Sequence, residues 1–480
     1  MAIIIINIQR KQLNISSTML KLFNRYFSIR SFIFLITETV FIFIIIIGVM
    51  ILFNDGSNKY QIHDITIKVL AISMILQLNL YYLGLYDFSY NRKIYNLCIK
   101  ILQAIGVTCL IIAIVHIAIP KSIINEETFI SGLVVTVIFL TFWRILFQAL
   151  CAKKLWNEPV LLVGDGYMAQ VILEEIKNNL DSGYTVAGIF SSHEESKLAK
   201  QNQVQHFGDM KRLCDIAQDL GIRKVIVALQ DRRGQSPVDP LLQCRLLGVE
   251  VLEGVRFYEL ISGRILATQI LPSWLIFSDG FHRSKGILLL KRIFDIVLSI
   301  IGLVLSIPLI LVIIVLIKST SKGPFLLQQI RVGQMNRNFV MYKFRTMYEN
   351  AETMSGAVWA QKEDPRVTSV GKVLRRLRLD EIPQFWNVLK GDMSFVGPRP
   401  ERPMFVDELR KHIPYYGERH SVKPGITGWA QIKYKYGASS EDALRKLEYD
   451  LFYIKNMSIL FDMYIVSKTI KAIFLGNGVR

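Results

Sequence analysis

The sequence is poor in cysteine, and this argues against a disulfide framework and against a cysteine-ligated zinc site. Its 480 residues include five cysteines, an odd number, and none of them forms a Cys-x-x-Cys pair. Such spacing predicts neither a disulfide framework nor a zinc site, so the thiols are interpreted as reduced and facing the cytosol. The five are Cys98, Cys109, Cys151, Cys214 and Cys244.

Acidic residues are also scarce, 39 against 57 basic ones, which leaves a formal net charge of +18. Basic chains commonly bind nucleic acid or an anionic membrane surface. Because 51% of the residues are hydrophobic, the membrane interpretation is favoured and no nucleic-acid partner is expected. The length allows about two to four domains.

Four long apolar segments, at about 31–53, 66–86, 98–119 and 128–149, are each able to cross a bilayer as a helix. A buried helical core is the alternative for such segments. Basic residues lie before the first helix, between the second and third, and after the fourth. The positive-inside rule therefore places both ends of this four-helix bundle in the cytosol. Those residues are Arg10, Lys11, Lys21, Arg25, Arg30, Arg92, Lys93, Lys100, Lys153 and Lys154.

A fifth apolar run, at about 293–317, has basic residues at both ends. Ser306 and Pro308 lie near its middle, where proline removes a helix hydrogen bond and bends the chain. We interpret the run as a re-entrant helix that enters one leaflet and returns to the cytosolic side. A fifth span with a proline kink is the alternative, and it would place the rest of the chain outside.

Strands alternate with helices between residues 156 and 284, which predicts a Rossmann-like α/β domain with a parallel sheet. Its strands are expected at 159–163, 185–190, 224–229 and 249–252. Gly164, Gly166 and Ala169 have the spacing of a loop that brings a phosphate to a helix N-terminus. The acid that a dinucleotide site needs after the second strand is missing. Both a nucleotide ligand and a shell kept for regulation or assembly therefore stay open.

Two adjacent acids, Asp380 and Glu381, precede Pro383 in the C-terminal part of the chain. Because proline suits a first helical turn, a helix is predicted from these acids to Leu389. A simple helix cap would explain one acid before a proline. Two acids beside many cations suit phosphate handling instead. The cations are Lys372, Arg375, Arg376 and Arg378, which folding could join to Arg345 and Arg399.

Cleavage of a diphosphate would explain these residue types. A carboxylate can attack phosphorus and form an acyl phosphate, which divides one difficult step into two. Mg²⁺ held by carboxylate and phosphate oxygens would offset the developing charge, while arginines bind the remaining oxygens. The basic and apolar stretch at 372–378 and the amphipathic stretch at 459–475 suit helices on a membrane surface, or ordinary solvated helices.

At five separated strings the sequence resembles the bacterial sugar transferase family, the monotopic polyprenyl-phosphate phosphoglycosyl transferases. The strings include Tyr342-Lys-Phe-Arg345, Asp380-Glu-Ile-Pro383, Gly397-Pro-Arg-Pro400 and Lys423-Pro-Gly-Ile-Thr-Gly428. Large members of that family combine four membrane helices, a Rossmann-like domain and a catalytic domain. The resemblance implies a multi-domain membrane protein with domains at 1–155, 156–284 and 285–480, the last mostly helical with a re-entrant helix.

The resemblance also implies roles for individual residues. Asp380 would be the nucleophile, Glu381 would support Mg²⁺ and the site geometry, and both acids would be metal ligands. Asn336 and Arg337 depart from a glycine that is common in the family. The expected phosphate and nucleotide contacts are Gln328, Arg331, Lys343, Arg345, Arg376, Arg399 and Pro400.

The implied reaction moves a hexose-1-phosphate from a UDP-sugar, UDP-glucose or UDP-galactose, to undecaprenyl phosphate and releases UMP. It would take place on the cytoplasmic face of the bacterial inner membrane, among anionic lipids, and begin exopolysaccharide or capsule synthesis. The sugar and a homo-oligomeric state stay open. A membrane-bound NAD-dependent epimerase or dehydratase is one alternative, and it needs a Tyr-x-x-x-Lys pair in its cofactor domain. In this sequence we find that spacing at Tyr464 and Lys468, far from the Rossmann-like domain. A non-enzymatic scaffold is the other alternative.

Overall fold

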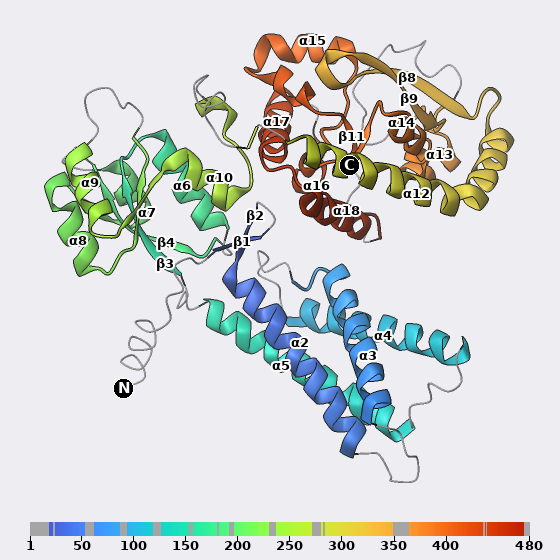
Figure 1. The fold of residues 1–480 in the computed structure, drawn as a ribbon, viewed down its shortest axis with the longest axis horizontal. Coiled ribbons are helices and arrows are strands. Elements are labelled where there is room, and N and C mark those ends of the chain that lie inside the picture. The colour runs from blue at the N-terminus through green and yellow to red at the C-terminus, as the bar shows by residue number, and fades with distance from the viewer. Residues whose placement is uncertain are drawn as a thin grey trace. The chain divides into compact units, whose positions relative to one another are not determined.

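The computed structural model forms two compact units (Figure 1). Apart from a few residues near the N-terminus, the first unit ends at Gly254 and the second begins at Val255. The domain boundary expected at 284–285 thus falls inside the second unit. The structure describes residues 19–22, 25–52, 62–86, 94–118, 126–152, 157–179, 182–191, 196–229, 237–270, 280–281, 284–348, 364–434, 437 and 439–474.

Apolar helices form the first part of the first unit, as expected. They are α2 (Ile29–Leu52), α3 (Ile62–Tyr82), α4 (Ile94–Ala118) and α5 (Glu126–Ala152). By length and composition α2, α4 and α5 are able to cross a membrane, whereas the apolar part of α3, Thr66–Tyr82, is shorter. Several of the basic residues used for orientation, among them Arg10, Arg92 and Lys153, lie outside the described residues.

An ion pair that the sequence pattern did not indicate lies inside this helical bundle. Arg144 on α5 contacts the carboxylate of Glu38 on α2 at 2.8 Å, and both side chains are almost completely buried. Arg144 Nη1 also donates to the carbonyl of Leu85, just after α3, at 2.7 Å. Because an unpaired charge at membrane depth is costly, this pair stabilises one arrangement of three chain segments.

A five-stranded parallel sheet with the order β5-β4-β3-β6-β7 confirms the Rossmann-like prediction. Its strands are β3 (Glu158–Val163), β4 (Tyr184–Phe190), β5 (Gln205–Phe207), β6 (Lys224–Val227) and β7 (Glu250–Glu253). The helices between them are α6 (Tyr167–Asn178), α7 (Lys197–Asn202), α8 (Leu213–Asp219) and α9 (Val238–Leu246). Strand β5 was not predicted, since three residues with one apolar side chain give no periodic signal.

The second unit is mostly helical, as expected, with two small sheets. Strands β8 (Leu326–Val332) and β9 (Asn338–Phe344) pair as an antiparallel hairpin, and β10 (Ser394–Val396) pairs in parallel with β11 (Gly425–Thr427). The helices are α10 (Gly254–Ser262), α12 (Lys285–Thr320), α13 (Ser369–Arg376), α14 (Gln384–Lys390), α15 (Pro403–His412), α16 (Trp429–Lys433), α17 (Ser440–Lys455) and α18 (Ile459–Phe474).

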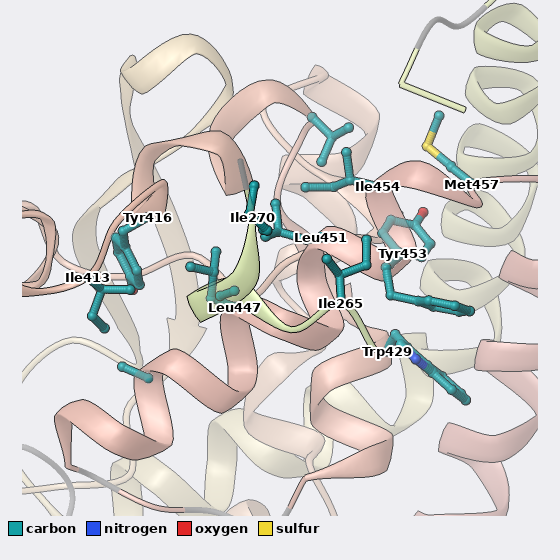
Figure 2. Close-up of a cluster of buried hydrophobic side chains, with 14 of the residues drawn as sticks. Ile265, Ile270, Ile413, Tyr416, Trp429, Leu447, Leu451, Tyr453, Ile454 and Met457 are labelled. Atoms are coloured by element: carbon teal, nitrogen blue, oxygen red, sulfur yellow. The ribbon is translucent and has the colours of Figure 1, made fainter. Parts of the chain in front are cut away.

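Helix α17 lies at the centre of the largest apolar core of this unit, where Leu447, Leu451 and Tyr453 are buried (Figure 2). Ile265 and Ile270, from the segment that follows α10, pack into the same core. The backbone N–H of Ile265 donates to the carbonyl of Glu448 on α17 at 3.1 Å. A segment that sequence reasoning placed in the middle domain is thus part of the C-terminal core.

Helix α12 contains Pro308, and both of its halves contact the rest of the second unit. Near its start, Lys291 Nζ contacts Asp462 Oδ2 of α18 at 2.6 Å. Near its end, Ile313 and Ile317 are buried in a core with Leu374 of α13. A straight helix of 36 residues would be about 54 Å long, and Figure 1 shows the ribbon turning within its yellow half.

Candidate active site

The two acids lie in a separate 3-10 turn, Leu379–Glu381, ahead of helix α14. The prediction that α14 begins at Asp380 is therefore wrong: the helix begins at Gln384 and Pro383 is its N-cap. Pro383 has no N–H to continue an α-helical ladder, and the turn is closed instead by Ile382 N bonding to Leu379 O at 3.3 Å.

Three cations face the carboxylate of Glu381, which is 7% exposed. Arg399 Nη2 lies 2.7 Å and Lys343 Nζ 3.4 Å from Oε1, while Arg378 Nη1 lies 3.6 Å from Oε2. Burial by itself raises the pKa of Glu381, but these cations outweigh it and hold the pKa well below its usual range. Glu381 is therefore an ionised centre around which the cations are arranged.

Asp380 is also buried, at 9% exposed, but has different surroundings. Among the described residues, none donates a hydrogen bond to its carboxylate or forms an ion pair with it within 4.0 Å. Burial raises the pKa of Asp380, and the negative charge of Glu381 adds to this effect while Lys343 opposes it. Two neighbouring carboxylates whose pKa values are pushed in opposite directions are suited to different tasks.

The segment that carries Arg399 is fixed through its backbone. Each carbonyl from Pro398 to Glu401 accepts a hydrogen bond, and the donors, in chain order, are Gly425 N, Arg419 Nη2, Arg331 Nη1 and Val332 N. Backbone carbonyls inside a fold need donors, and here all four donors come from other parts of the chain. The Arg399 side chain consequently starts from a rigid position.

Arg419 is a site-supporting residue that sequence reasoning missed. Its buried guanidinium pairs with Asp450 Oδ2 at 2.8 Å and donates to Tyr416 Oη at 2.5 Å and to Arg399 O at 3.0 Å. Arg419 lies between the recognised strings in sequence, and Asp450 lies on α17. The pattern therefore contains no signal that these two residues meet behind Arg399.

Lys343 is positioned by strand β9, which Asn387 joins to α14. The Asn387 side chain accepts from Tyr342 N at 3.0 Å and donates to Val340 O at 2.7 Å, so it pairs with the strand like another backbone segment. Asn387 is fully buried. This contact holds Lys343 next to the turn that carries the acids.

The strings that contain Gly397 and Gly425 meet at a close backbone crossing. A Cβ on Gly425 would lie 2.1 Å from Gly397 N, and a Cβ on Gly397 would lie 2.5 Å from Lys423 O. Neither space can be opened by moving a flexible side chain, because the obstructing atoms belong to the backbone. The two glycines therefore allow the Gly-Pro-Arg-Pro string to approach the Lys-Pro-Gly-Ile-Thr-Gly string.

The structure brings together only part of the predicted contact set. Lys343 and Arg399 lie at Glu381, and Pro400 contributes its carbonyl to Arg331. Arg345 bonds instead to Ser321, at the end of α12. Gln328 and Arg376 are exposed. Arg378 joins the site in addition, although sequence reasoning had placed it only among the neighbouring cations.

The hairpin turn between β8 and β9 has Asn336 and Arg337 at the place where a glycine was expected. Asn336 adopts a left-handed conformation, with φ of 62°, which asparagine tolerates better than most residues. Its side-chain Oδ1 lies 2.8 Å from His420 Nδ1. Burial, with the neighbouring charges of Arg419 and Arg410, lowers the pKa of His420 to about 3, so the ring stays neutral.

Mg²⁺ fits the dyad through one of its two acids. Both oxygens of Glu381 already face cations, so Glu381 does not fit as a metal ligand in this arrangement. Asp380 fits, since its carboxylate has no such partner among the described residues. One carboxylate together with substrate phosphates is a common way to hold Mg²⁺ in phosphate-processing enzymes.

The glycine loop of the middle domain has the expected place but a mixed chemistry. Gly164 follows β3 with φ of 111°, and a Cβ there would lie 2.8 Å from Ala228 O. Gly166 is the N-cap of α6, and Ala169 is buried. Ser191, at the position where an acid was missing, donates to Asp165 Oδ2 at 2.7 Å. A carboxylate in the loop disfavours a phosphate, so the spacing explains the fold of this loop better than a ligand.

Comparison with known proteins identifies the C-terminal half. Residues 287–476 match the model of the bacterial sugar transferase family. The chain is 31% identical over 348 residues, 71% of its length and 72% of the other's, to a UDP-glucose:undecaprenyl-phosphate glucose-1-phosphate transferase of Xanthomonas campestris. The chain belongs to the bacterial sugar transferase family. The family resemblance drawn from the motifs is thereby confirmed, and with it the expectation of a transferase.

Other relatives differ in the sugar that they are named for. The chain is 45% identical over 240 residues to a UDP-N-acetylgalactosamine-undecaprenyl-phosphate N-acetylgalactosaminephosphotransferase of Aeromonas hydrophila. The aligned part covers 50% of this chain and 56% of that protein. The chain is 34% identical over 320 residues to the corresponding glucose-1-phosphate transferase of Escherichia coli, which covers 65% and 66%. The chain therefore spans under two thirds of the length of some relatives. Residues 82–251 match the model of a CoA-binding domain.

Proposed function

We propose that this sugar transferase moves a sugar-1-phosphate from a UDP-sugar to undecaprenyl phosphate and releases UMP. The observation that carries the proposal is the contrast between the two acids. Glu381 is surrounded by Arg399, Lys343 and Arg378, whereas the carboxylate of Asp380 has no partner among the described residues. This arrangement supports a nucleophile beside a cationic surface that can bind a diphosphate.

The reaction proceeds in two displacements. An oxygen of the Asp380 carboxylate forms a bond to the phosphorus that bears the sugar, the bond from that phosphorus to the bridging oxygen breaks, and UMP leaves with the bridging oxygen. An oxygen of the acceptor phosphate then forms a bond to the same phosphorus. The bond to Asp380 breaks, the carboxylate is restored, and the lipid carries a diphospho-sugar.

Cations around Glu381 supply the electrostatic stabilisation for this chemistry. Arg399 is held from behind through its carbonyl, so its guanidinium needs little reorganisation when charge develops on the phosphate oxygens. We propose Mg²⁺ as the cofactor, with Asp380 and the donor diphosphate as its ligands. Bound there, Mg²⁺ would neutralise part of the diphosphate charge.

Helix α12 supports a membrane location with the catalytic unit on the cytoplasmic face. Its apolar side chains are exposed, for example Leu305 at 73%, while Asp295 and Ile317, one from each half, pack into the same unit. We propose that α12 enters one leaflet and returns near Pro308. This topology keeps the site where UDP-sugars occur, and the basic flanks of the first helices favour the same side.

The rival epimerase function has no support in the site. Tyr464 and Lys468 lie together on α18, where Lys468 Nζ is 5.7 Å from the centre of the Tyr464 ring. That helix belongs to the C-terminal unit and not to the Rossmann-like sheet. We propose that the donor is a UDP-hexose or a UDP-N-acetylhexosamine. The transfer would be the first membrane step of exopolysaccharide or capsule synthesis.

The test is labelling of the purified full chain by a UDP-sugar that is radioactive in the sugar-bearing phosphate, with no lipid acceptor present. Wild type is expected to carry label and to release one equivalent of UMP, and Asp380→Asn to do neither. Asp407→Asn, an exposed acid on α15, is the matched control and should be labelled normally. An unlabelled wild type that nonetheless turns over with acceptor would refute the covalent mechanism. Running the panel with glucose, galactose and N-acetylgalactosamine donors identifies the sugar.

A further inference from the structure

Arg345 is a buried cation whose hydrogen-bonding capacity is only partly used. It follows strand β9 and is 7% exposed. Its Nη2 donates to the carbonyl of Ser321 at 2.9 Å and to the Ser321 hydroxyl at 2.8 Å. The Nε and Nη1 groups are buried and have no hydrogen-bond partner among the residues that the structure describes. Among the described residues, no carboxylate forms an ion pair with Arg345.

A buried guanidinium in this condition is expected to have an anionic ligand. Ser321 is the C-cap of α12, so Nη2 satisfies the end of that helix and gains from its dipole. Capping alone would leave the other two nitrogen groups buried and unsatisfied, which is costly for a charged side chain. A phosphate, which offers several acceptor oxygens and a negative charge, would satisfy both groups at once.

The place of Arg345 indicates which phosphate binds there. Lys343, two residues earlier on the same strand face, contacts Glu381, and Thr346, the next residue, accepts from Arg375 Nε at 2.8 Å. Arg345 thus lies beside the catalytic turn but points to the end of α12. The last turns of α12 expose apolar side chains, with Leu311 at 61% and Val315 at 67%.

We propose that Arg345 binds the phosphate monoester of the polyprenyl acceptor, while Lys343 and Arg399 bind the diphosphate of the donor. The apolar tail of the acceptor would run along the exposed face of α12, and its phosphate would stop at Arg345. This inference rests on the proposed function and assigns the two substrates of that reaction to different cations. In the second displacement, the attacking oxygen belongs to the phosphate that Arg345 holds.

Separating the two half-reactions tests the assignment in the full chain in detergent. Arg345→Gln is expected to release UMP from UDP-sugar without acceptor within about twofold of wild type. Its KM for undecaprenyl phosphate should rise by about 10- to 100-fold, the range for a lost charged hydrogen bond. Arg345→Lys keeps the charge but not the forked guanidinium, so its KM for undecaprenyl phosphate should lie between those of wild type and Arg345→Gln. Arg337→Gln, an exposed arginine on the hairpin turn, is the matched control and should not change either value.

A loss of UMP release in Arg345→Gln and Arg345→Lys that matches their loss of turnover would overturn the assignment, because Arg345 would then serve the donor. Direct binding keeps this result distinct from failure of the proposed function. Wild type should bind radiolabelled undecaprenyl phosphate more tightly than Arg345→Gln and Arg345→Lys do, even if no covalent label forms. Competition by inorganic phosphate as strong as by the lipid would show a site for free phosphate and refute the lipid assignment. Thermal unfolding of each variant shows whether its fold is retained.

Discussion

Replacing Glu381 by glutamine should weaken catalysis and, at the same time, move its acid limb to lower pH. Asp380 has to be ionised to attack, and its pKa is raised by burial and by the charge of Glu381. Without bound Mg²⁺, Asp380 in wild type should therefore ionise at a higher pH than an ordinary aspartate, near 3.9, and bound Mg²⁺ would lower the pKa in wild type and variant alike. Glutamine removes the negative neighbour but keeps the shape, so the pKa of Asp380 falls and the ionised form persists to lower pH.

The loss of rate follows from the contacts of Glu381. Its shortest bond, 2.7 Å to Arg399, is a charged hydrogen bond, and Lys343 lies 3.4 Å from the same oxygen. A charged hydrogen bond contributes about 1.5–3 kcal/mol. Losing this restraint on Arg399 should lower kcat/KM for the UDP-sugar by about 10- to 100-fold.

Single-turnover UMP release, measured from pH 4 to pH 8 on the detergent-solubilised chain, gives both quantities. Glu408→Gln, an exposed acid on α15, is the matched control and should leave the rate and the acid limb unchanged. An acid limb that stays in place or moves to higher pH in Glu381→Gln would refute the electrostatic coupling of the two acids. An unchanged kcat/KM would refute the role of Glu381 in positioning Arg399.

Three further results are expected. Arg419→Lys should lower kcat by about tenfold with little change in KM for undecaprenyl phosphate, because it releases the carbonyl of Arg399 and touches no substrate; equal loss in both parameters would contradict a positioning role. Gly397→Ala should unfold at a lower temperature and lose activity, since a Cβ would lie 2.5 Å from a backbone oxygen. Arg144→Met should destabilise the chain by about 3–5 kcal/mol in denaturant titrations, because it leaves Glu38 buried and unpaired, whereas the double variant with Glu38→Leu should recover part of that loss.

Periodic and compositional signals predicted the parts of this fold that depend on local sequence. The apolar segments, the strands of the parallel sheet and α18 follow from runs and alternations within about twenty residues. Strand β5 and the hairpin β8–β9 were missed because their side chains alternate weakly. The segment from Ile265 to Ile270 was placed with the wrong partner, since its apolar residues suit any core and only the fold shows that they pack against α17.

The site shows the same division between local and long-range information. The adjacent acids and the arginine-rich strings were recognisable, because phosphate chemistry limits which residue types can serve. Arg419 and Asp450 were not, since their contribution is a backbone bond to Arg399 that no spacing reveals. Gln328 and Arg376 were included for their place in a string, but both are exposed and neither contacts the acids among the interactions of the described residues.

The different roles of Asp380 and Glu381 are a property of the turn and not of the residue types. Had α14 begun at Asp380, both carboxylates would have lain at a helix N-terminus, where exposed N–H groups stabilise either charge. Pro383 delays the start of the helix. Arg378, in a left-handed conformation with φ of 55°, precedes the turn, and its guanidinium is one of the three cations that face Glu381. Asp380 is then buried with no cation of the described residues paired to its carboxylate, which leaves that carboxylate open to Mg²⁺ and to the substrate. The carboxylate therefore keeps an oxygen available for attack, and the neighbouring acid keeps the cations within reach of the phosphate that Asp380 attacks.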